Sequence, residues 1–192
     1  FAPIVMPDSL FDFQQALVEW ALLKGRASLF EDCGLGKTLQ QLVWADNVVR
    51  HTNKPVLLLT PLAVSHQTMT EAHKFGIEAH RPETGTVKPG INITNYERLH
   101  RFDPSRFTAV VLDESSILKA FDGKTKQRLI DSCKGVKYRL CCTATPSPND
   151  IAELANHAEF LGLITRAEFL ATWFVHDEQG WRMKRHAVQP FY

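Results

Sequence analysis

The chain is organised around one stretch, Glu31-Asp32-Cys33-Gly34-Leu35-Gly36-Lys37-Thr38. It follows a short apolar run at 27–30 and precedes a helically spaced segment at 39–45. A strand, a glycine turn and a helix in this order form a phosphate cradle, because backbone N–H groups and the positive end of the helix face the same point. Lys37 would reach the outer phosphates, and the Thr38 hydroxyl would bind Mg²⁺.

This pattern is that of a P-loop with one departure. The full pattern has glycine at its first position, where this chain has Glu31. The prediction of a nucleotide site therefore rests on the last five residues of the stretch, which are Gly34, Leu35, Gly36, Lys37 and Thr38. A glycine turn that precedes a lysine by chance is the alternative reading.

The composition indicates a globular protein with one domain-sized core. Of 192 residues, 44% are hydrophobic and 22% are charged, and the net charge is +1. This length supports one well-cored domain, and the near-neutral charge confines any nucleic-acid surface to a local patch. No apolar run approaches the ~18 residues of a membrane helix and no signal peptide is visible, so we expect no membrane partner. The four cysteines fit no zinc or C-x-x-C spacing, which favours a reducing, cytoplasmic setting.

Short apolar runs alternate with segments long enough for helices. A first helix is predicted over 13–23, with Asp8 or Asp12 as its cap. Strands are expected at 27–30, 56–60, 91–94, 109–112 and 138–142, and later helices at 63–75, 124–133 and 151–161. Continuously apolar strands are typical of a parallel sheet covered on both faces. The pattern predicts an α/β doubly wound fold whose ligand lies beyond the carboxyl ends of the strands.

The last part of the chain does not continue the alternation of strands and helices. Residues 172–175 and 181–183 flank a turn at 177–180, which predicts a hairpin that projects after the core sheet has ended.

A second motif carries chemistry, the apolar strand Val110-Val111-Leu112 that ends in Asp113 and Glu114. Asp113 would hold Mg²⁺ directly or through water, and Glu114 would orient or deprotonate the attacking water. Two carboxylates after a buried strand are otherwise a solvated loop start. The P-loop earlier in the chain favours the functional reading.

Three segments then make a family resemblance visible. Asp113-Glu114-Ser115-Ser116, with Lys119 after it, resembles a DEAH-type box. Thr143-Ala144-Thr145-Pro146, followed by Asn149, resembles motif III of helicases. Phe13-Gln14, before Trp20, resembles the Q motif that reads adenine.

From Leu10 to Leu163 the chain is similar to the first RecA-like lobe of superfamily 2 helicases, and among these to the Swi/Snf-like DNA translocases, including phage and prophage versions. The resemblance implies a P-loop NTPase lobe that uses ATP and Mg²⁺. It also implies that Gln14 hydrogen-bonds the adenine edge, although a glutamine on a helix surface is the alternative.

Coupling residues follow from the same resemblance. Thr143 and Thr145 would link the nucleotide site to the nucleic acid through hydroxyl hydrogen bonds. The alternative is that this segment is only a strand terminus followed by a turn, because such residues favour turns. Ser116 stands where Swi/Snf-like enzymes have histidine, so its link to motif III would differ or run through water.

A DNA partner is implied as well. Thr60-Pro61 and Thr94-Asn95 resemble motifs Ia and Ib, which touch the sugar-phosphate backbone and so position a strand without reading its sequence. Lys119 and the run 124–128 would add phosphate attraction, and a solvated helix face explains that run equally well.

In this family, ATP is hydrolysed between two RecA-like lobes, and the second lobe supplies arginine fingers worth ~10³–10⁵ in rate in related phosphoryl transfer. No Gln-x-x-Gly-Arg-like segment follows Pro146. We therefore expect residues 1–165 to form the first lobe and residues 166–192 to begin a projection or a connection toward a second lobe. This chain should bind nucleotide but turn it over very slowly.

Two other readings remain open. The first is a nucleotide-gated nucleic-acid-binding or scaffolding module that never hydrolyses ATP. The second, a P-loop kinase or small GTPase, is disfavoured because Gln14 and the segment 143–146 would have no role in it. The resemblance places the protein in the cytoplasm of a bacterial or phage-infected cell.

Overall fold

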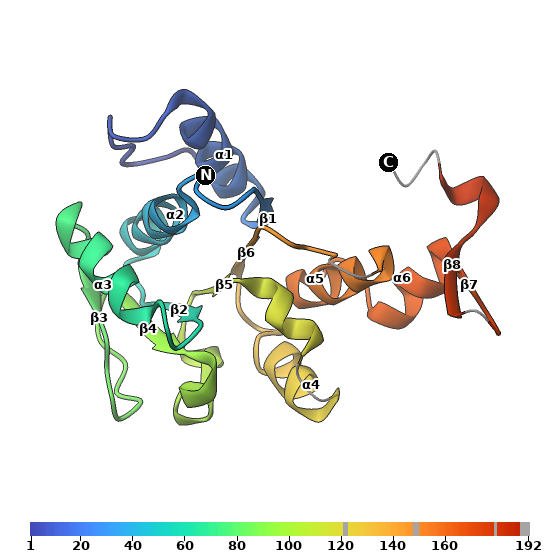
Figure 1. Cartoon of the computed structure of the whole chain (residues 1–192). Coiled ribbons are helices and arrows are strands. Elements are labelled where there is room, and N and C mark those ends of the chain that lie inside the picture. Colours follow the sequence, from blue (N-terminus) through green and yellow to red (C-terminus); the bar gives the residue numbers. More distant parts are fainter. Residues whose placement is uncertain (121–122, 148–149, 179, 189–192) are drawn as a thin grey trace.

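The computed structural model describes residues 1–120, 123–147, 150–178 and 180–188. Within these residues the centre of the molecule is a six-stranded sheet in the order β1-β6-β5-β2-β4-β3, and every neighbouring pair is parallel (Figure 1). The strands are β1 (Arg26–Phe30), β2 (Val56–Thr60), β3 (Ala79–His80), β4 (Ile91–Asn95), β5 (Ala109–Asp113) and β6 (Tyr138–Thr143). The predicted doubly wound parallel sheet is confirmed.

Successive side chains of the central strands enter two different cores. In β2, Val56 and Leu58 belong to one apolar cluster, and Leu57 and Leu59 belong to the other. This alternation is the two-residue period of a strand. It explains why the strands are continuously apolar, since both faces of the sheet are covered.

Helices complete both cores (Figure 1). The first core is covered by α1 (Asp12–Lys24), α2 (Lys37–Thr52) and α3 (Ser65–Lys74). The second is covered by α4 (Gly123–Ser132), α5 (Leu154–Leu161) and the 3₁₀ turns η1 (Tyr96–Arg101) and η3 (Ser115–Lys119). Further 3₁₀ turns are η2 (Pro104–Arg106), η4 (Ile151–Glu153) and η5 (Arg185–Ala187). None of the helices in the described residues combines the length and the apolar composition that crossing a membrane requires.

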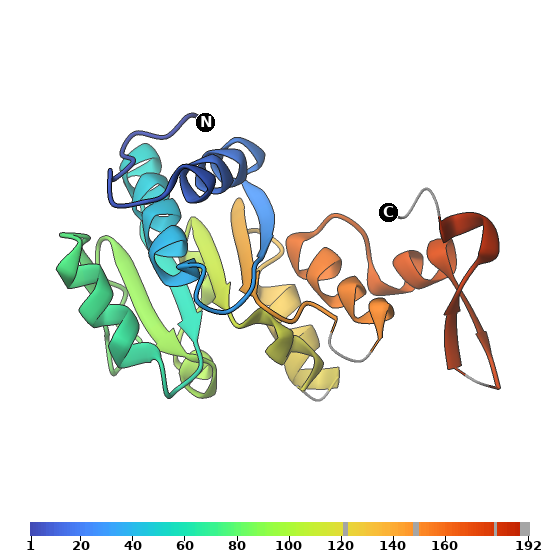
Figure 2. The same ribbon diagram turned by 45° about the horizontal axis from the view of Figure 1, so that its top comes forward.

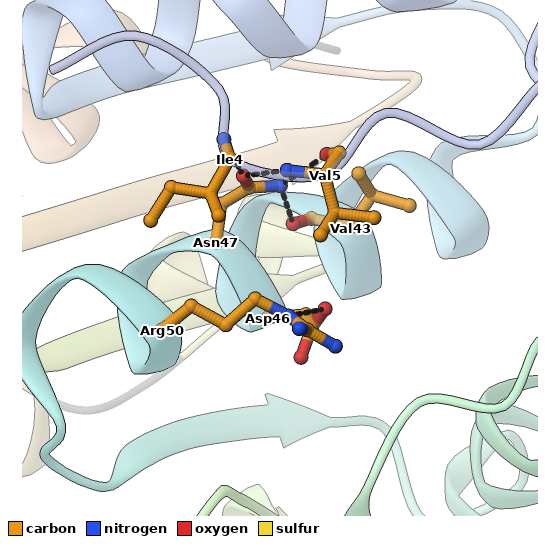
Figure 3. A network of polar contacts seen from close by, with 6 residues as sticks. All are labelled: Ile4, Val5, Val43, Asp46, Asn47 and Arg50. Carbon is orange, nitrogen blue, oxygen red and sulfur yellow. Dashed lines mark hydrogen bonds and ion pairs between the residues drawn. The ribbon is translucent and has the colours of Figure 1, made fainter.

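The segment before α1 is fixed to α2 by one buried amide (Figure 3). The Asn47 Oδ1 accepts hydrogen bonds from the backbone N–H groups of Ile4 (2.6 Å) and Val5 (2.9 Å). Its Nδ2 donates to the carbonyls of Val5 and Val43, each at 2.8 Å. Because both ends of this buried amide are satisfied, the attachment is specific. It fixes the path of the chain into α1.

The predicted cap of α1 is wrong. Neither Asp8 nor Asp12 caps the helix, because Phe11 is the N-cap residue and Asp12 is the first helical residue. The Gln14 Oε1 accepts a hydrogen bond from the Phe11 N–H at 2.9 Å, which is the contact that the third helical residue makes in a capping box. A glutamine in the first turn therefore fixes the start of the helix in place of the expected aspartate cap.

The predicted hairpin is present but begins later than expected. Residues 172 and 173 end the helix α6 (Arg166–Trp173), and the antiparallel strands are β7 (Phe174–Asp177) and β8 (Gly180–Met183). Thr165 and Glu168 cap each other at the start of α6, which favours helix at this point. Figure 2 shows the hairpin extending away from the central sheet.

Candidate functional site

Five of the predicted motifs follow strands of the central sheet, whereas the Q-like Phe13-Gln14 lies in α1. Because neighbouring strands are parallel, their carboxyl ends lie at one edge. The glycine-rich loop follows β1, motif Ia follows β2, motif Ib follows β4, the acidic box follows β5 and motif III follows β6. The topology therefore brings five sequence-distant segments to one side of the molecule.

The loop between β1 and α2 is closed by its own lysine. Lys37 is the first residue of α2 and is buried, and its Nζ donates to the carbonyls of Glu31 and Asp32, each at 2.9 Å. Gly34 and Gly36 have φ values of 83° and 79°, a region that glycine adopts without strain. Thr38 is half-buried beside Lys37. The Lys37 amine, expected to bind the phosphates, and the Thr38 hydroxyl, expected to bind Mg²⁺, therefore both lie at the N-terminus of α2.

Gln14 links α1 to this loop. It is 5% exposed, so the alternative of a helix-surface glutamine is wrong. Its Nε2 donates to the Leu35 carbonyl at 2.8 Å. A Cβ on Gly36 would overlap this amide, so the glycine also allows the two elements to approach. The predicted contact of Gln14 with adenine stays a prediction.

Glu31 occupies the first loop position without filling the cradle. It is 8% exposed, and its Oε1 accepts from the Gln40 Nε2 of α2 at 3.0 Å. Its backbone N–H donates to the Thr143 carbonyl at 3.2 Å. The side chain turns under the helix, which explains how an acidic residue fits where the P-loop pattern has glycine. The backbone hydrogen bond from Glu31 to Thr143 also joins the loop to motif III.

The acidic box begins with a buried aspartate. Asp113 is the last residue of β5 and is 7% exposed, and burial raises the pKa of its carboxyl to about 6, while the side chain of Gln41 and the Lys37 ammonium act in the opposite direction. The Tyr96 hydroxyl donates to the Asp113 carbonyl at 2.6 Å. Lys37 and Asp113 are thus close enough to interact electrostatically.

Glu114 connects the box to motif III. Its backbone lies in the left-handed region, with φ 50° and ψ 53°. The Thr143 hydroxyl donates to its Oε2 at 3.2 Å and accepts from the Thr145 N–H at 3.1 Å. Ser116 lies in η3 and is half-buried, and the Thr143 hydroxyl reaches Glu114 instead of Ser116. Asn149, expected next to motif III, lies outside the described residues.

The predicted nucleic-acid residues are largely occupied by local contacts. Thr60, Thr94 and Asn95 are buried. The Thr60 hydroxyl donates to the Pro61 carbonyl at 3.1 Å, and the Asn95 Oδ1 caps η1 through the Arg98 N–H. Lys119 is exposed, with its Nζ 3.9 Å from a Glu153 carboxylate oxygen. Their contact with DNA stays a prediction.

Sequence reasoning did not assign the contacts that Tyr96 and His157 make in this site, nor the exposed ring of Phe11. Tyr96 and His157 contact the backbone of Asp113 and the side chain of Ser115 from other elements. Phe11 and Phe13 are exposed and stack beside Gln14, with ring centroids 6.2 Å apart. Phe13 carried a signal because it adjoins the Q-like glutamine, and Tyr96 because it follows Asn95 in the segment that resembles motif Ib. Phe11 and His157 carried none.

The donor set suits Mg²⁺ bound together with phosphates better than a protein-only metal site. No group of three or more His, Cys, Asp and Glu side chains with metal-site geometry occurs in the described part of the chain. Mg²⁺ commonly uses one or two carboxylates and completes its shell with phosphate oxygens and water. Asp113, the Thr38 hydroxyl and the open space around Gly34 fit that arrangement.

Comparison with known proteins agrees with this geometry. The model of the SNF2-related domain family matches residues 13–179. The chain is 28% identical to the SWI/SNF-related matrix-associated actin-dependent regulator of chromatin subfamily A-like protein 1 of Xenopus tropicalis, over 76% of this chain and 17% of that protein. It is 29% identical to the uncharacterized ATP-dependent helicase YqhH of Bacillus subtilis, over 83% and 31%. It is 28% identical to the putative protein p41 of Acyrthosiphon pisum secondary endosymbiont phage 1, over 84% and 42%.

Solved structures share the fold. The Sulfolobus solfataricus SWI2/SNF2 ATPase core in complex with dsDNA superposes with a TM-score of 0.75 at 23% identity, over 90% of this chain and 40% of that chain. The UvsW helicase of bacteriophage T4 gives a TM-score of 0.59 at 13% identity, over 81% and 58%. The chain thus spans less than half the length of these curated relatives and of the Sulfolobus core.

Proposed function

This chain belongs to the SNF2-related domain family, and we propose that it is the N-terminal ATP-binding lobe of a superfamily 2, Swi/Snf-like DNA translocase or helicase. One observation carries the proposal: Lys37, Asp113 and Glu114 come from segments far apart in sequence and gather at the carboxyl edge of one parallel sheet. A phosphate-binding amine beside two carboxylates is the arrangement that phosphoryl transfer from Mg-ATP requires.

Nucleotide binding is assigned to the loop 31–38. Its backbone N–H groups and the N-terminus of α2 attract the phosphates. Lys37, which now donates to two loop carbonyls, would exchange these bonds for the outer phosphates. Mg²⁺ would neutralise the phosphate charge, with Thr38 and Asp113 as its protein ligands.

Hydrolysis is assigned to Glu114. Its carboxylate would orient and deprotonate the attacking water, which is the role of a general base. The hydrogen bond from Thr143 holds this carboxylate toward motif III. Thr143 and Thr145 would thereby pass the state of the nucleotide site to the nucleic-acid site.

The complete reaction requires a second RecA-like lobe of the same polypeptide, which would close on ATP and supply arginine fingers. The coverage of only 40% of the Sulfolobus ATPase core supports this part of the proposal. DNA is the proposed track, because that core was solved with dsDNA. The relatives from Bacillus subtilis and from a phage fit an origin in a bacterial or phage-infected cell, and we propose a cytoplasmic location there.

Glu114→Gln in the complete protein tests the enzymatic role. We expect the DNA-stimulated ATPase rate to fall roughly 100-fold or more, the usual contribution of a general base, with Mg-ATP affinity retained. Glu83→Gln, an exposed carboxylate elsewhere, is the matched control and should leave the rate unchanged. A protein whose DNA-linked activity is indifferent to Glu114→Gln would be a nucleotide-gated scaffold.

A further inference from the structure

Helix α5 places one buried histidine at the junction of the phosphate loop and the acidic box. The His157 Nε2 lies 3.0 Å from the Ser115 Oγ. The same ring meets Phe30 edge-on, with ring centroids 5.2 Å apart and planes at 78°. Phe30 ends β1 immediately before the loop, and Ser115 immediately follows Glu114. One imidazole therefore touches both halves of the nucleotide site.

The contact to Ser115 lies next to a strained residue. A non-glycine residue in the left-handed region, as Glu114 is, is strained and persists only where its surroundings hold it. On one side of Glu114, the Tyr96 hydroxyl bonds the Asp113 carbonyl, and on the other side His157 bonds Ser115. These two contacts clamp the peptide segment that aims the Glu114 carboxylate.

The environment of His157 suits a fixed hydrogen bond. The residue is 4% exposed, and burial lowers the pKa of its imidazole to about 4. The ring is therefore neutral near pH 7, and it either donates to or accepts from the Ser115 hydroxyl according to its tautomer. It adds no charge beside the carboxylates of the box.

We propose that His157 is a positioning residue for Glu114, which it holds through Ser115 while anchoring the box to the end of β1 through Phe30. The inference rests on the proposed function, because it presupposes that Glu114 acts on the attacking water. It also explains how a box with serine at position 116 is still supported by an imidazole, which arrives from a helix about 40 residues later.

Steady-state kinetics of four forms of the complete protein test the proposal: wild type, His157→Phe, Ser115→Ala and the double variant. His157→Phe keeps an aromatic ring beside Phe30 but loses the hydrogen bond. We expect kcat to fall about tenfold in each single variant, with the KM for ATP within about twofold. The double variant should be no slower than the slower single variant, because both changes remove the same His157–Ser115 hydrogen bond.

Two further variants separate positioning from general damage. His157→Gln, whose amide nitrogen can take the place of Nε2, should recover at least half of the lost kcat. His73→Phe, an exposed histidine on α3, is the matched control and should leave kcat and KM unchanged. Losses that multiply in the double variant, no rescue by glutamine, or a change confined to KM would each overturn the proposal.

A readout that needs no catalysis distinguishes this proposal from the proposed function. In histidine ¹⁵N NMR spectra of this chain, Ser115→Ala should shift the His157 Nε2 resonance and leave the resonances of the exposed histidines in place. An unchanged His157 resonance would refute the contact. Absence of ATP hydrolysis in the unmodified complete protein, with the NMR shift present, would instead count against the proposed function.

Discussion

The burial of Asp113 favours its neutral form, whereas its proposed role as a Mg²⁺ ligand requires the charged form. Burial raises the pKa of its carboxyl to about 6, even though the nearby Lys37 lowers it. A metal ligand must be deprotonated. Near pH 7 the folded protein therefore keeps a buried negative charge that costs stability, and the function assigned to Asp113 explains why the charge is placed there.

Replacing this charge should stabilise the nucleotide-free protein. The pKa of Asp113 is raised from its unfolded value to about 6 by folding, so the contribution of the carboxyl to stability is fully present below pH ~4 and is lost as the pH rises through 6. Asparagine stays neutral throughout. Asp113→Asn should therefore be more stable than wild type at about pH 7.5, by up to about 3 kcal/mol, and the gain should vanish near pH 4.

Urea unfolding at the two pH values measures this gain, with Asp8→Asn, an exposed aspartate, as the control. The same substitution should abolish Mg²⁺-dependent ATP binding. A variant that is less stable than wild type at both pH values would show that the Asp113 carboxylate stabilises the fold, contrary to this account.

Residues in contiguous motifs could be predicted, and residues that join them across the fold could not. Lys37, Thr38 and Asp113 belong to short sequence motifs, and the neighbouring residues in each motif indicate their chemical role. Tyr96 lies in the segment that resembles motif Ib, but that pattern does not mark its contact with Asp113, 17 residues away. His157 contacts a partner 42 residues away, and no local pattern marks it. The burial of Glu31 was equally hidden, because its partner Gln40 becomes a neighbour only when α2 forms.

At the scale of elements, the loop 31–36 is held to α1 as well as to α2. The Leu35 carbonyl accepts from the Gln14 Nε2 at 2.8 Å and from the Gln40 Nε2 at 3.1 Å. Both loop glycines have positive φ, but a Cβ on Gly34 would meet nothing within 4 Å, whereas one on Gly36 would overlap the Gln14 amide. The two glycines are therefore not equivalent.

A pair of alanine substitutions should reveal this difference. Gly34→Ala should cost ~1–2 kcal/mol of unfolding free energy, the cost of a left-handed conformation alone. Gly36→Ala should cost more, because it also displaces Gln14. Urea unfolding of both variants makes the comparison. Adding Gln14→Ala to Gly36→Ala should remove part of the excess, and equal costs in the two single variants would contradict the packing described.

Elements differed in how well the sequence predicted them. The strand at 56–60 has the predicted bounds, because a strand buried on both faces is continuously apolar and ends where the polarity changes. The cap of α1 was wrong because Gln14 acts from inside the helix. The start of the hairpin was wrong because the aromatic residues at 173–174 suit either a helix end or a strand, and the cap at Thr165 decides in favour of helix.

At the scale of the molecule, the order of the strands creates the site. β1, the first strand, pairs with β6, the last strand of the sheet, and β6 pairs with β5. This places the phosphate loop, motif III and the acidic box after three adjacent strands. The sequence predicted a parallel sheet with its ligand at the carboxyl edge, but not this order, because pairing between distant strands leaves no local signature.

The proposed second lobe makes a prediction for this chain alone. It should bind Mg-ATP but hydrolyse it ~10³-fold or more slowly than the complete protein with DNA, because the arginine fingers would come from the other lobe. Parallel ATPase assays of the two proteins, with and without duplex DNA, measure the ratio. Rapid turnover by this chain without assistance would contradict a site divided between lobes.

The central claim is that Lys37, Thr38, Asp113 and Glu114 serve one Mg-ATP. Calorimetric titration of this chain with Mg-ATP, alongside Lys37→Ala and the exposed control Lys54→Ala, tests it most directly. We predict that Lys37→Ala loses at least about tenfold in affinity, with a native far-UV spectrum, while Lys54→Ala binds like wild type. Equal affinity in all three proteins would place the nucleotide elsewhere and contradict the account.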